Sequence, residues 1–206
     1  SDPPAVLPGD DKGWGWWELR YVDPAQGASR ADVDALRLLA VFLAHWDNKA
    51  DNQRLACPGG DCSRPLLLLQ DLGSTFGPSK VNLPRWRSAP IWADPAHCVV
   101  SMQSLPYAGA TFLDAAISEA GRLSLLERLQ SVGPEQIRGL FQGARFPEFY
   151  SATSDARDLD AWTTAFLDRV RTIADGGPCP EPPERGTDRS VDRGTIERRA
   201  ASRLCP

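Results

Sequence analysis

The fold is decided by His45-Trp46-Asp47-Asn48-Lys49-Ala50-Asp51-Asn52, a stretch of the form H-x-D-x-K-x-x-N. A second stretch, Asp71-Leu72-Gly73-Ser74-Thr75-Phe76-Gly77, follows it and begins with D-x-G. Both stretches concentrate carboxylate and amide side chains, which supply the oxygen ligands that hard cations such as Mg²⁺ prefer. The interpretation of the chain therefore depends on how its other segments place these two stretches.

A helix is predicted immediately before the first stretch. Ser29 is a suitable N-cap, and Asp32 stands at the position from which its carboxylate can reach back to the cap. Residues 35–44 are apolar nearly all round, which indicates a helix that is buried on most of its surface. The end of this helix delivers His45 and Asp47 into a loop.

A two-stranded hairpin is predicted between the two stretches. Residues 54–56 read as one short strand, residues 57–64 as the turn, and residues 65–70 as a leucine-rich second strand. Asn52 stands just before the first strand and Asp71 just after the second. Because the open end of an antiparallel hairpin brings these two positions to one edge, the side chains of the two stretches are expected to converge.

The first 28 residues are predicted to be a lead-in that contains one strand. Trp14–Val22 is aromatic and β-branched enough to favour a strand. Two roles fit its cluster of tryptophans, stacking on a ligand or packing on the core, and packing is the more common. Residues 77–109 are predicted to form a long loop anchored by Trp86 and Trp92, and a loop of this length is usually functional or disordered.

The C-terminal half is predicted to hold four helices and a tail. Capping residues and apolar spacing place the helices at 112–118 with Thr111 as cap, 119–129, 134–143 and 158–173. Beyond Gly176 proline and charged residues predominate, which is typical of a tail or linker. The predicted domains are thus a lead-in at 1–28, a folded lobe at 29–176 and a tail at 177–206, and the predicted fold class is α+β, mainly helical.

Composition limits the partners of the chain. At 206 residues and 42% hydrophobic content it can bury one substantial core. A formal net charge of -4 gives no electrostatic support for nucleic acid as a partner. No apolar run reaches the roughly 18 residues that a transmembrane helix requires, so no transmembrane segment is predicted. Arginine greatly outnumbers lysine, a bias typical of a GC-rich bacterial genome.

The five cysteines match no four-ligand zinc pattern. Cys57 and Cys62 flank a tight turn and are close enough in sequence for a disulfide, while Cys179 and Cys205 flank the polar tail and form a second candidate pair. Free thiols, buried or on the surface, are the alternative. Either disulfide would favour an extracytoplasmic location, periplasmic or secreted, because the cytosol keeps thiols reduced.

The two stretches contain the residues that phosphoryl transfer requires. This chemistry needs an acceptor hydroxyl held in line and cations that neutralise the phosphates. Asp47 can orient the hydroxyl and accept its proton, and Lys49 can reach the transferring phosphoryl group. Asn52 and Asp71 supply oxygen ligands for Mg²⁺ or Mn²⁺, and His45 is expected behind the loop as a structural hydrogen-bonding residue.

These residues resemble the protein-kinase-like superfamily. The form D-x-G-x-x-F, read at Asp71, Gly73 and Phe76, is closer to atypical branches, such as type II phosphatidylinositol 4-kinases and secretory-pathway kinases, than to ordinary protein kinases. Similarity to HipA-like bacterial kinases is weaker. The resemblance is close over residues 36–77. It implies the C-terminal lobe of a kinase fold built around a small catalytic β-hairpin, with Gly73 and Phe76 as structural residues.

The same resemblance assigns roles in catalysis. It implies Asp47 as the catalytic base with Lys49 beside it, Asn52 and Asp71 as metal ligands, and ATP as the phosphate donor bound through Lys49, Asn52 and Asp71. The predicted function is metal-dependent transfer of the ATP γ-phosphate to a hydroxyl-bearing acceptor. Among protein, lipid headgroup and small molecule, a protein acceptor is slightly favoured, because proteins dominate as substrates of the superfamily.

Three features depart from the superfamily pattern. Trp46 replaces the arginine with which many kinases sense a phosphorylated activation loop, and the interval from Asn52 to Asp71 is longer than usual. Only 44 residues precede His45, and they contain neither a G-x-G-x-x-G loop nor a V-A-I-K segment. The N-terminal lobe is therefore expected to be absent or to lie in a separate segment outside this chain.

Two further functions stay open on the sequence alone. One is a pseudokinase-type binding module, without catalysis, whose tryptophan-rich loops bind a partner. The other is an unrelated metal-dependent hydrolase that uses Asp47, Asp51 and Asp71.

Overall fold

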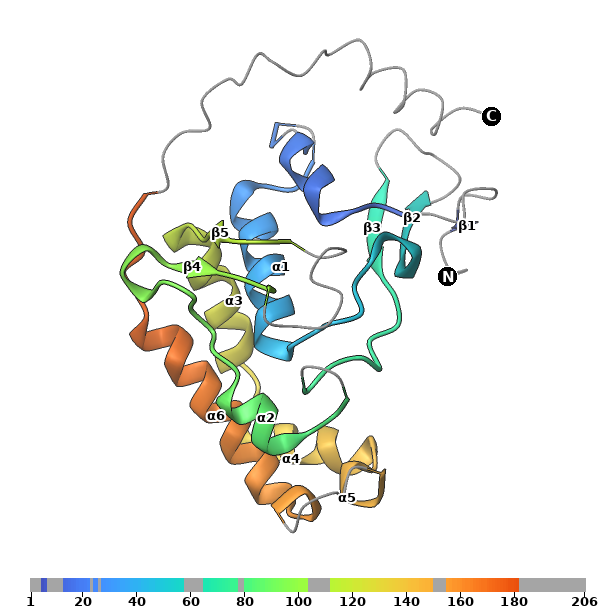
Figure 1. Cartoon of the computed structure of the whole chain (residues 1–206), viewed down its shortest axis with the longest axis vertical. Helices are drawn as coiled ribbons and strands as arrows, with labels where there is room; N and C mark the ends of the chain where they lie inside the picture. Colours follow the sequence, from blue (N-terminus) through green and yellow to red (C-terminus); the bar gives the residue numbers. More distant parts are fainter. Residues whose placement is uncertain are drawn as a thin grey trace.

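The structure is a computed structural model that describes residues 5–6, 13–22, 24–25, 27–57, 65–77, 80–103, 112–149 and 155–181. It is an α+β fold, mainly helical, with two small antiparallel sheets (Figure 1). The predicted fold class is confirmed at this level. The predicted tail at 177–206 lies outside the described residues from residue 182 onward.

The helical part is organised around α1 (Arg30–Leu43) and α6 (Leu159–Asp175). α1 packs against α3 (Glu119–Gln130), and α6 packs against α3 and two further helices (Figure 1). Those two are α2 (Leu83–Ser88) and α4 (Pro134–Gly143), and a short α5 (Phe146–Phe149) follows α4. Helices were therefore correctly predicted at α1, α3, α4 and α6.

Local capping explains where α1 begins. The Ser29 side chain accepts a hydrogen bond from the backbone N–H of Asp32, and the Asp32 carboxylate accepts from the backbone N–H of Ser29. This reciprocal pair is the predicted capping box. The helix ends at Leu43, and the left-handed backbone of the following Ala44 (φ 50°) turns the chain sharply into the first stretch.

The larger sheet contains the predicted hairpin. Its strand order is β1-β2-β3, with β1 at Ala5–Val6, β2 at Gln53–Cys57 and β3 at Leu66–Leu69. β2 and β3 are antiparallel, and their register pairs Gln53 with Leu69. A second sheet pairs β4 (Val99–Val100) with β5 (Ala115–Ala116).

The predicted strand at Trp14–Val22 is wrong. Residues 16–21 form a 3₁₀ helix instead, η1 (Trp16–Tyr21), which begins after Gly15. The Glu18 carboxylate accepts the Gly15 N–H at 2.6 Å and thereby stabilises the start of this helix. Trp16 and Leu19 are buried while Trp17 between them is exposed, so the buried positions repeat every three residues, as a 3₁₀ helix requires, rather than every two.

Two other predicted segments need correction. The long predicted loop at 77–109 contains α2, a 3₁₀ turn η4 (Pro95–His97) and β4, although its predicted anchors Trp86 and Trp92 are indeed buried. Asn82 caps α2 by accepting the backbone N–H of Arg85 at 3.0 Å. The helix predicted over 112–118 is instead extended chain that contains β5, and Thr111 lies outside the described residues.

The C-terminal end of α1 is fixed by a buried arginine of α6. Arg169 donates to the carbonyl oxygens of Val41 and Phe42 at 3.0 Å each, and to those of Trp86 at 2.8 Å and Ala89 at 2.6 Å. Burial lowers the pKa of this guanidinium to about 10, so it stays charged at neutral pH. One positive charge thus stabilises the last carbonyls of α1 directly before the first stretch.

The cysteines are connected differently from the prediction. Cys179 forms a disulfide with Cys98, 81 residues earlier, and not with Cys205. The sequence could not show this, because α6 and the turn before β4 meet only in the folded chain. Cys57 is also disulfide-bonded, while its predicted partner Cys62 lies outside the described residues, as does Cys205.

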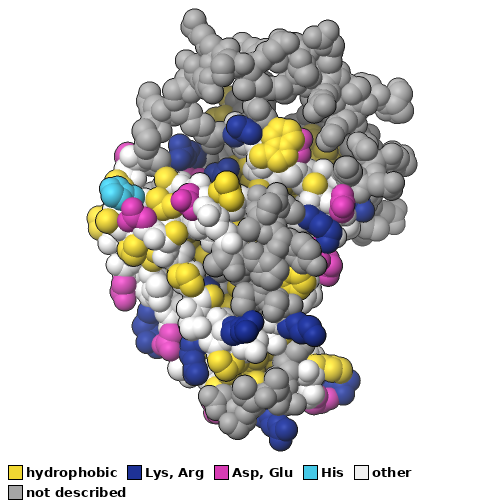
Figure 2. All heavy atoms as spheres, in the orientation of Figure 1, with side chains coloured by type: hydrophobic (Ala, Val, Ile, Leu, Met, Phe, Trp, Pro, Cys, Tyr) yellow, Lys and Arg dark blue, Asp and Glu magenta, His cyan; other side chains and the backbone are white. Residues whose placement is uncertain are grey.

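The surface carries charges of both signs. Among the described residues on the face drawn in Figure 2, positive and negative side chains are interspersed and form no large field of one sign. Within the described residues, no helix combines the length and the apolar character that crossing a membrane requires.

Candidate functional site

The two stretches meet at the carbonyl oxygen of Ser74. The backbone N–H of Trp46 donates to this oxygen at 3.1 Å, and the His45 ring nitrogen Nδ1 lies 3.3 Å from it. Since a carbonyl oxygen only accepts, Nδ1 is the protonated ring nitrogen. His45 therefore lies behind the loop and joins the two stretches, as its predicted structural role requires.

Burial controls the protonation of His45. The side chain is almost entirely buried, and this desolvation lowers the pKa of the imidazole below its ordinary value of 6.5. The Ser74 carbonyl and the carboxylates of Asp47 and Asp71 oppose that shift without overcoming it. His45 is thus neutral at neutral pH. Because the carboxylates of Asp47 and Asp71 both act electrostatically on its ring, the two stretches lie close to each other in the fold.

Asp47, Lys49 and Asn52 form one hydrogen-bonded group on the first stretch. Lys49 Nζ lies 2.6 Å from Asp47 Oδ1, and Asn52 Nδ2 donates to the backbone oxygen of Asp47 at 2.8 Å. The Asp47 side chain retains 15% of its exposure. A carboxylate and an ammonium group are therefore held together at a partly exposed position of the loop.

The hairpin places Asp71 beside this group. The backbone N–H of Gln70 donates to Asn52 O at 3.1 Å, one step beyond the last strand pair, so Asp71 follows directly at the same edge. Asp71 is exposed, and its backbone is left-handed at φ 52°. Its carboxylate forms no hydrogen bond or ion pair with the described residues. The backbones of the two stretches therefore meet at this edge of the hairpin, while the convergence of the Asn52 and Asp71 side chains on one ligand stays a prediction.

The loop after Asp71 is fixed to the helical core through Phe76. The backbone N–H of Phe76 donates to Leu43 O at 2.7 Å, and the ring packs edge to face against Trp86, Phe146 and Phe141 at centroid distances of 4.9, 5.3 and 5.5 Å. The backbone of Phe76 is left-handed as well, at φ 57°. Gly73 lies exposed at the open side of the same loop.

A tryptophan and a glutamine support the first stretch from behind, and sequence reasoning missed this role. Trp16 Nε1 and Gln53 Nε2 both donate to the carbonyl oxygen of Asn48, at 3.1 and 3.2 Å, and Asn48 Nδ2 donates to His45 O at 2.6 Å. Trp14 Nε1 similarly donates to Leu68 O of β3 at 3.2 Å. The tryptophan cluster was a visible signal, but its partners lie more than thirty residues away.

Three atoms of this supporting network are buried without a hydrogen-bond partner in the described part of the chain. They are His45 Nε2, Asn48 Oδ1 and Gln53 Oε1. Buried polar groups are nearly always paired, and exceptions concentrate at functional sites. The network therefore marks this loop as a candidate site independently of its sequence pattern.

The chemistry of the outward-facing side chains fits a hard divalent cation. Asn52 uses Nδ2 to hold the loop, which leaves its amide oxygen outside every described hydrogen bond, and Asp71 adds an exposed carboxylate. Mg²⁺ is commonly bound by one or two protein oxygens together with substrate phosphates and water. Among the described residues, no group of three or more His, Cys, Asp or Glu side chains is arranged to hold a metal by itself.

Comparison of the chain with known protein families, curated proteins and solved structures finds no match. The functional argument therefore rests on the residues of the two stretches and on their geometry.

Proposed function

We propose that this chain is the catalytic, C-terminal lobe of an atypical kinase-like phosphotransferase, which moves the γ-phosphate of ATP to a hydroxyl acceptor with Mg²⁺ or Mn²⁺. The observation that carries the proposal is the Gln70 to Asn52 backbone hydrogen bond. It sets Asp71 at the same hairpin edge as Asn52, and Asn52 is bonded to Asp47. The base and both metal ligands that the resemblance implies thus belong to backbone segments that lie next to each other, and this proximity supports the proposal.

Each side chain has a distinct task in this proposal. Asp47 orients the acceptor hydroxyl and takes its proton, and Lys49, which lies against Asp47, stabilises negative charge on the phosphoryl group. Asn52 and Asp71 hold the cation by their oxygens. The cation, when bound, neutralises the phosphate oxygens and keeps them in line for transfer. His45, being buried and neutral, holds the loop and exchanges no proton with the substrate.

We infer that a separate segment or chain supplies the remaining grip on ATP. The sequence contains no phosphate-covering glycine-rich loop upstream of His45, and Lys12 lies outside the described residues. The acceptor is most consistent with a protein hydroxyl, on the resemblance alone. We also infer an extracytoplasmic location, supported by the Cys98–Cys179 disulfide, because such bonds persist in oxidising compartments.

A pseudokinase-type binding module is the second candidate. The 2.6 Å pair between Lys49 and Asp47 supports this candidate. The ammonium group occupies the carboxylate that would otherwise accept the proton of the acceptor hydroxyl, as expected for a loop that no longer catalyses. The hydrolase alternative has less support. Its third acid, Asp51, is exposed, and the described residues form no three-acid cluster with Asp47 and Asp71.

The test measures Mn²⁺-ATP binding and phosphate transfer with the whole 206-residue chain. Binding of Mn²⁺-ATP is followed by electron paramagnetic resonance, and transfer by radiolabelled γ-phosphate on a mixture of protein substrates. Asp71→Asn is expected to weaken Mn²⁺-ATP binding, whereas Asp47→Asn should retain binding and lose transfer. Asp168→Asn on α6, a partly exposed acid remote in sequence from both stretches, is the matched control and should behave as the unmodified chain.

The outcomes separate the candidates. Binding that depends on Asp71 together with transfer that depends on Asp47 supports the phosphotransferase. Binding that depends on Asp71 without any transfer supports the pseudokinase-type module. If the chain fails to bind Mn²⁺-ATP, and neither Asp47→Asn nor Asp71→Asn alters any activity, both kinase-like proposals are refuted.

A further inference from the structure

Arg54 lies on the face of the β2–β3 hairpin that is turned away from the core. Successive side chains of a strand point to opposite faces of a sheet, and directly opposed residues share a face. Gln53 is fully buried, and Leu55 and Leu69 pack against the core, so these residues define the inner face. Arg54 and its cross-strand partner Leu68 therefore belong to the outer face.

The Arg54 side chain is folded back toward the end of the hairpin at which the two stretches meet. Its Nη1 atom donates to the backbone oxygens of Asp51 and Gln53, at 2.7 Å each. These two carbonyl groups belong to the residues on either side of Asn52, a proposed metal ligand. The guanidinium group is thus fixed beside the proposed metal-binding end of the hairpin and does not extend toward the turn.

Arg54 is not paired with an acid within the described part of the chain. Both of its hydrogen-bond acceptors are uncharged carbonyl oxygens, and it forms no ion pair with a described residue. Its Nε and Nη2 groups stay outside every hydrogen bond among the described residues, and the side chain is half-buried. A planar guanidinium with such N–H groups is the side chain best suited to bind phosphate oxygens.

A metal-bound triphosphate needs a further cation at this place. One divalent cation leaves part of the negative charge of ATP unneutralised, and phosphoryl transfer depends on stabilising that charge. Lys49 already lies against Asp47 at 2.6 Å. Arg54 is a second cation on the same segment, and the hairpin itself holds it in place.

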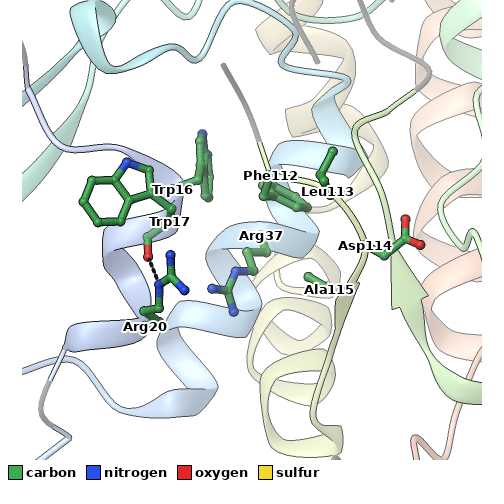
Figure 3. Close-up of a pocket in the computed structure, with 8 residues that line it drawn as sticks. All are labelled: Trp16, Trp17, Arg20, Arg37, Phe112, Leu113, Asp114 and Ala115. Atoms are coloured by element: carbon green, nitrogen blue, oxygen red, sulfur yellow. Dashed lines mark hydrogen bonds between the residues drawn. The ribbon is translucent and has the colours of Figure 1, made fainter. Parts of the chain in front are cut away.

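The arginines of the nearest described cavity do not serve this purpose. Arg20 and Arg37 line a cavity of about 310 Å³ between η1, α1 and the segment that enters β5 (Figure 3). Its lining includes no residue of either stretch. A nucleotide held at Asn52 and Asp71 therefore depends on cations of the hairpin and its neighbouring loop.

The acids near Arg54 decide which form of phosphate it can bind. Asp51 and Asp71 are exposed, and both lie at the end of the hairpin toward which Arg54 is folded. Their carboxylates repel a bare phosphate and attract a divalent cation. Phosphate and cation are therefore expected to bind there together.

We propose that Arg54 binds the phosphates of the metal-bound nucleotide through Nε and Nη2. This proposal rests on the proposed phosphotransfer function and assigns part of the grip on ATP to this chain. The ligand that the chain itself recognises is a polyphosphate carrying a divalent cation, while contacts to the adenosine part are left to the separate segment.

Equilibrium dialysis of radiolabelled ATP in the presence of Mn²⁺ tests the proposal with the whole chain. Arg54→Gln is expected to weaken Mn²⁺-ATP binding by about tenfold or more, as for the loss of a charge-assisted hydrogen bond. Arg54→Lys keeps the charge but loses the planar fork, so its affinity should lie between those of Arg54→Gln and the unmodified chain. Arg171→Gln removes an exposed arginine of α6 paired with Asp168, and this matched control should leave binding unchanged.

Two further measurements separate a phosphate contact from a structural role. Inorganic tripolyphosphate with Mn²⁺ should compete with ATP for the unmodified chain, and its affinity should fall in Arg54→Gln by about the same factor as that of ATP. Binding of Mn²⁺ alone, followed by electron paramagnetic resonance, should not weaken in Arg54→Gln, because the loss of a nearby positive charge favours a bound cation.

The outcomes distinguish this proposal from the phosphotransferase on which it rests. If the unmodified chain binds Mn²⁺-ATP and Arg54→Gln binds it as tightly as Arg171→Gln does, the role of Arg54 is overturned and the phosphotransferase is unaffected. The role is also overturned if tripolyphosphate does not compete, or if Arg54→Gln weakens binding of Mn²⁺ alone by the same factor. A chain that does not bind Mn²⁺-ATP at all overturns both proposals.

Discussion

Gly121 lies where α3 packs directly against α1, and substituting it tests the packing of the fold. A Cβ atom added to Gly121 would lie 2.5 Å from the Cβ of Asp34, a separation that real side chains do not tolerate. Asp34 cannot withdraw easily, because it is fully buried and its carboxylate is bonded to Arg30, Arg37 and the backbone of Ser118. Gly121→Ala is therefore expected to force the two helices apart.

A second helical glycine supplies the matched control. Gly139 lies inside α4, and a Cβ atom added there would meet nothing within 4 Å. Both substitutions gain the same helix propensity, about 1 kcal/mol, whereas overpacking a buried contact costs about 1–3 kcal/mol. Gly139→Ala should therefore raise the free energy of unfolding. The free energy of unfolding of Gly121→Ala should be lower than that of Gly139→Ala by about 1–3 kcal/mol, the overpacking cost.

Urea unfolding of both variants measures this difference. Far-ultraviolet circular dichroism and tryptophan fluorescence should give coincident transitions, and an unchanged dependence on urea would show that the variants differ in stability rather than compactness. In thermal unfolding the gap corresponds to about 2–4 °C for each kcal/mol in a chain of this size. Equal stabilisation by the two substitutions would refute the close approach of α1 and α3.

Three further perturbations test the connections that hold the site. Replacing Cys98 and Cys179 together by alanine should lower the free energy of unfolding by up to about 4 kcal/mol, given the long loop that their disulfide closes; a non-reduced peptide map that links Cys179 to another cysteine would contradict the pairing. Arg169→Lys should lower the free energy of unfolding in urea by about 2–4 kcal/mol, because one ammonium group cannot reach the four carbonyl oxygens that the planar guanidinium satisfies. Full stability of this variant would rule out that role. Because burial lowers the pKa of His45 in the folded state, the unfolded chain binds more protons, and stability should decline as pH falls below about 6.5 toward the lower folded pKa. His45→Gln should flatten that part of the stability–pH profile, and an unaltered slope would assign it to other groups.

The elements that the sequence predicted correctly are those whose signals are local. The capping box of Ser29 and Asp32 and the apolar run behind it determine α1 within one short segment. Similarly, two β-prone runs separated by a turn determine the β2–β3 hairpin, and its open end brings the backbones of Asn52 and Asp71 to one edge. The hydrogen bonds that join Asp47, Lys49 and Asn52 are also local, although the sequence reasoning did not predict them.

The features that the sequence did not reveal depend on partners far along the chain. Trp16 contributes to the site by donating to Asn48 O, and this partner cannot be read from an aromatic cluster that fits a strand equally well. Arg169 looks like a solvent-facing charge of an amphipathic helix, yet it is buried against carbonyl oxygens of α1 and α2. The pairing of Cys179 is nonlocal in the same way, since 81 residues separate it from Cys98.

The side chains of the first stretch divide into two sets with opposite orientations. His45 and Asn48 point inward and hold the loop, with buried atoms that find no partner among the described residues. Asp47, Lys49 and Asn52 are partly exposed to solvent. A loop that served stability alone would gain by pairing its buried atoms, so this division favours a site in which the outward set has a task of its own.

Asp71→Gly distinguishes a functional from a structural role for the second stretch. Asp71 has a left-handed backbone, which costs an L-residue roughly 1 kcal/mol or more. Its carboxylate makes no hydrogen bond with the described residues that could offset this cost. Glycine adopts this backbone readily, so the substitution should leave the free energy of unfolding unchanged or raise it by up to about 1 kcal/mol. Binding of Mn²⁺-ATP should decrease in the same variant, because one of two proposed oxygen ligands is lost. A variant that loses stability but keeps binding would show that the Asp71 carboxylate serves the fold, and the phosphotransferase would then lack its main metal ligand.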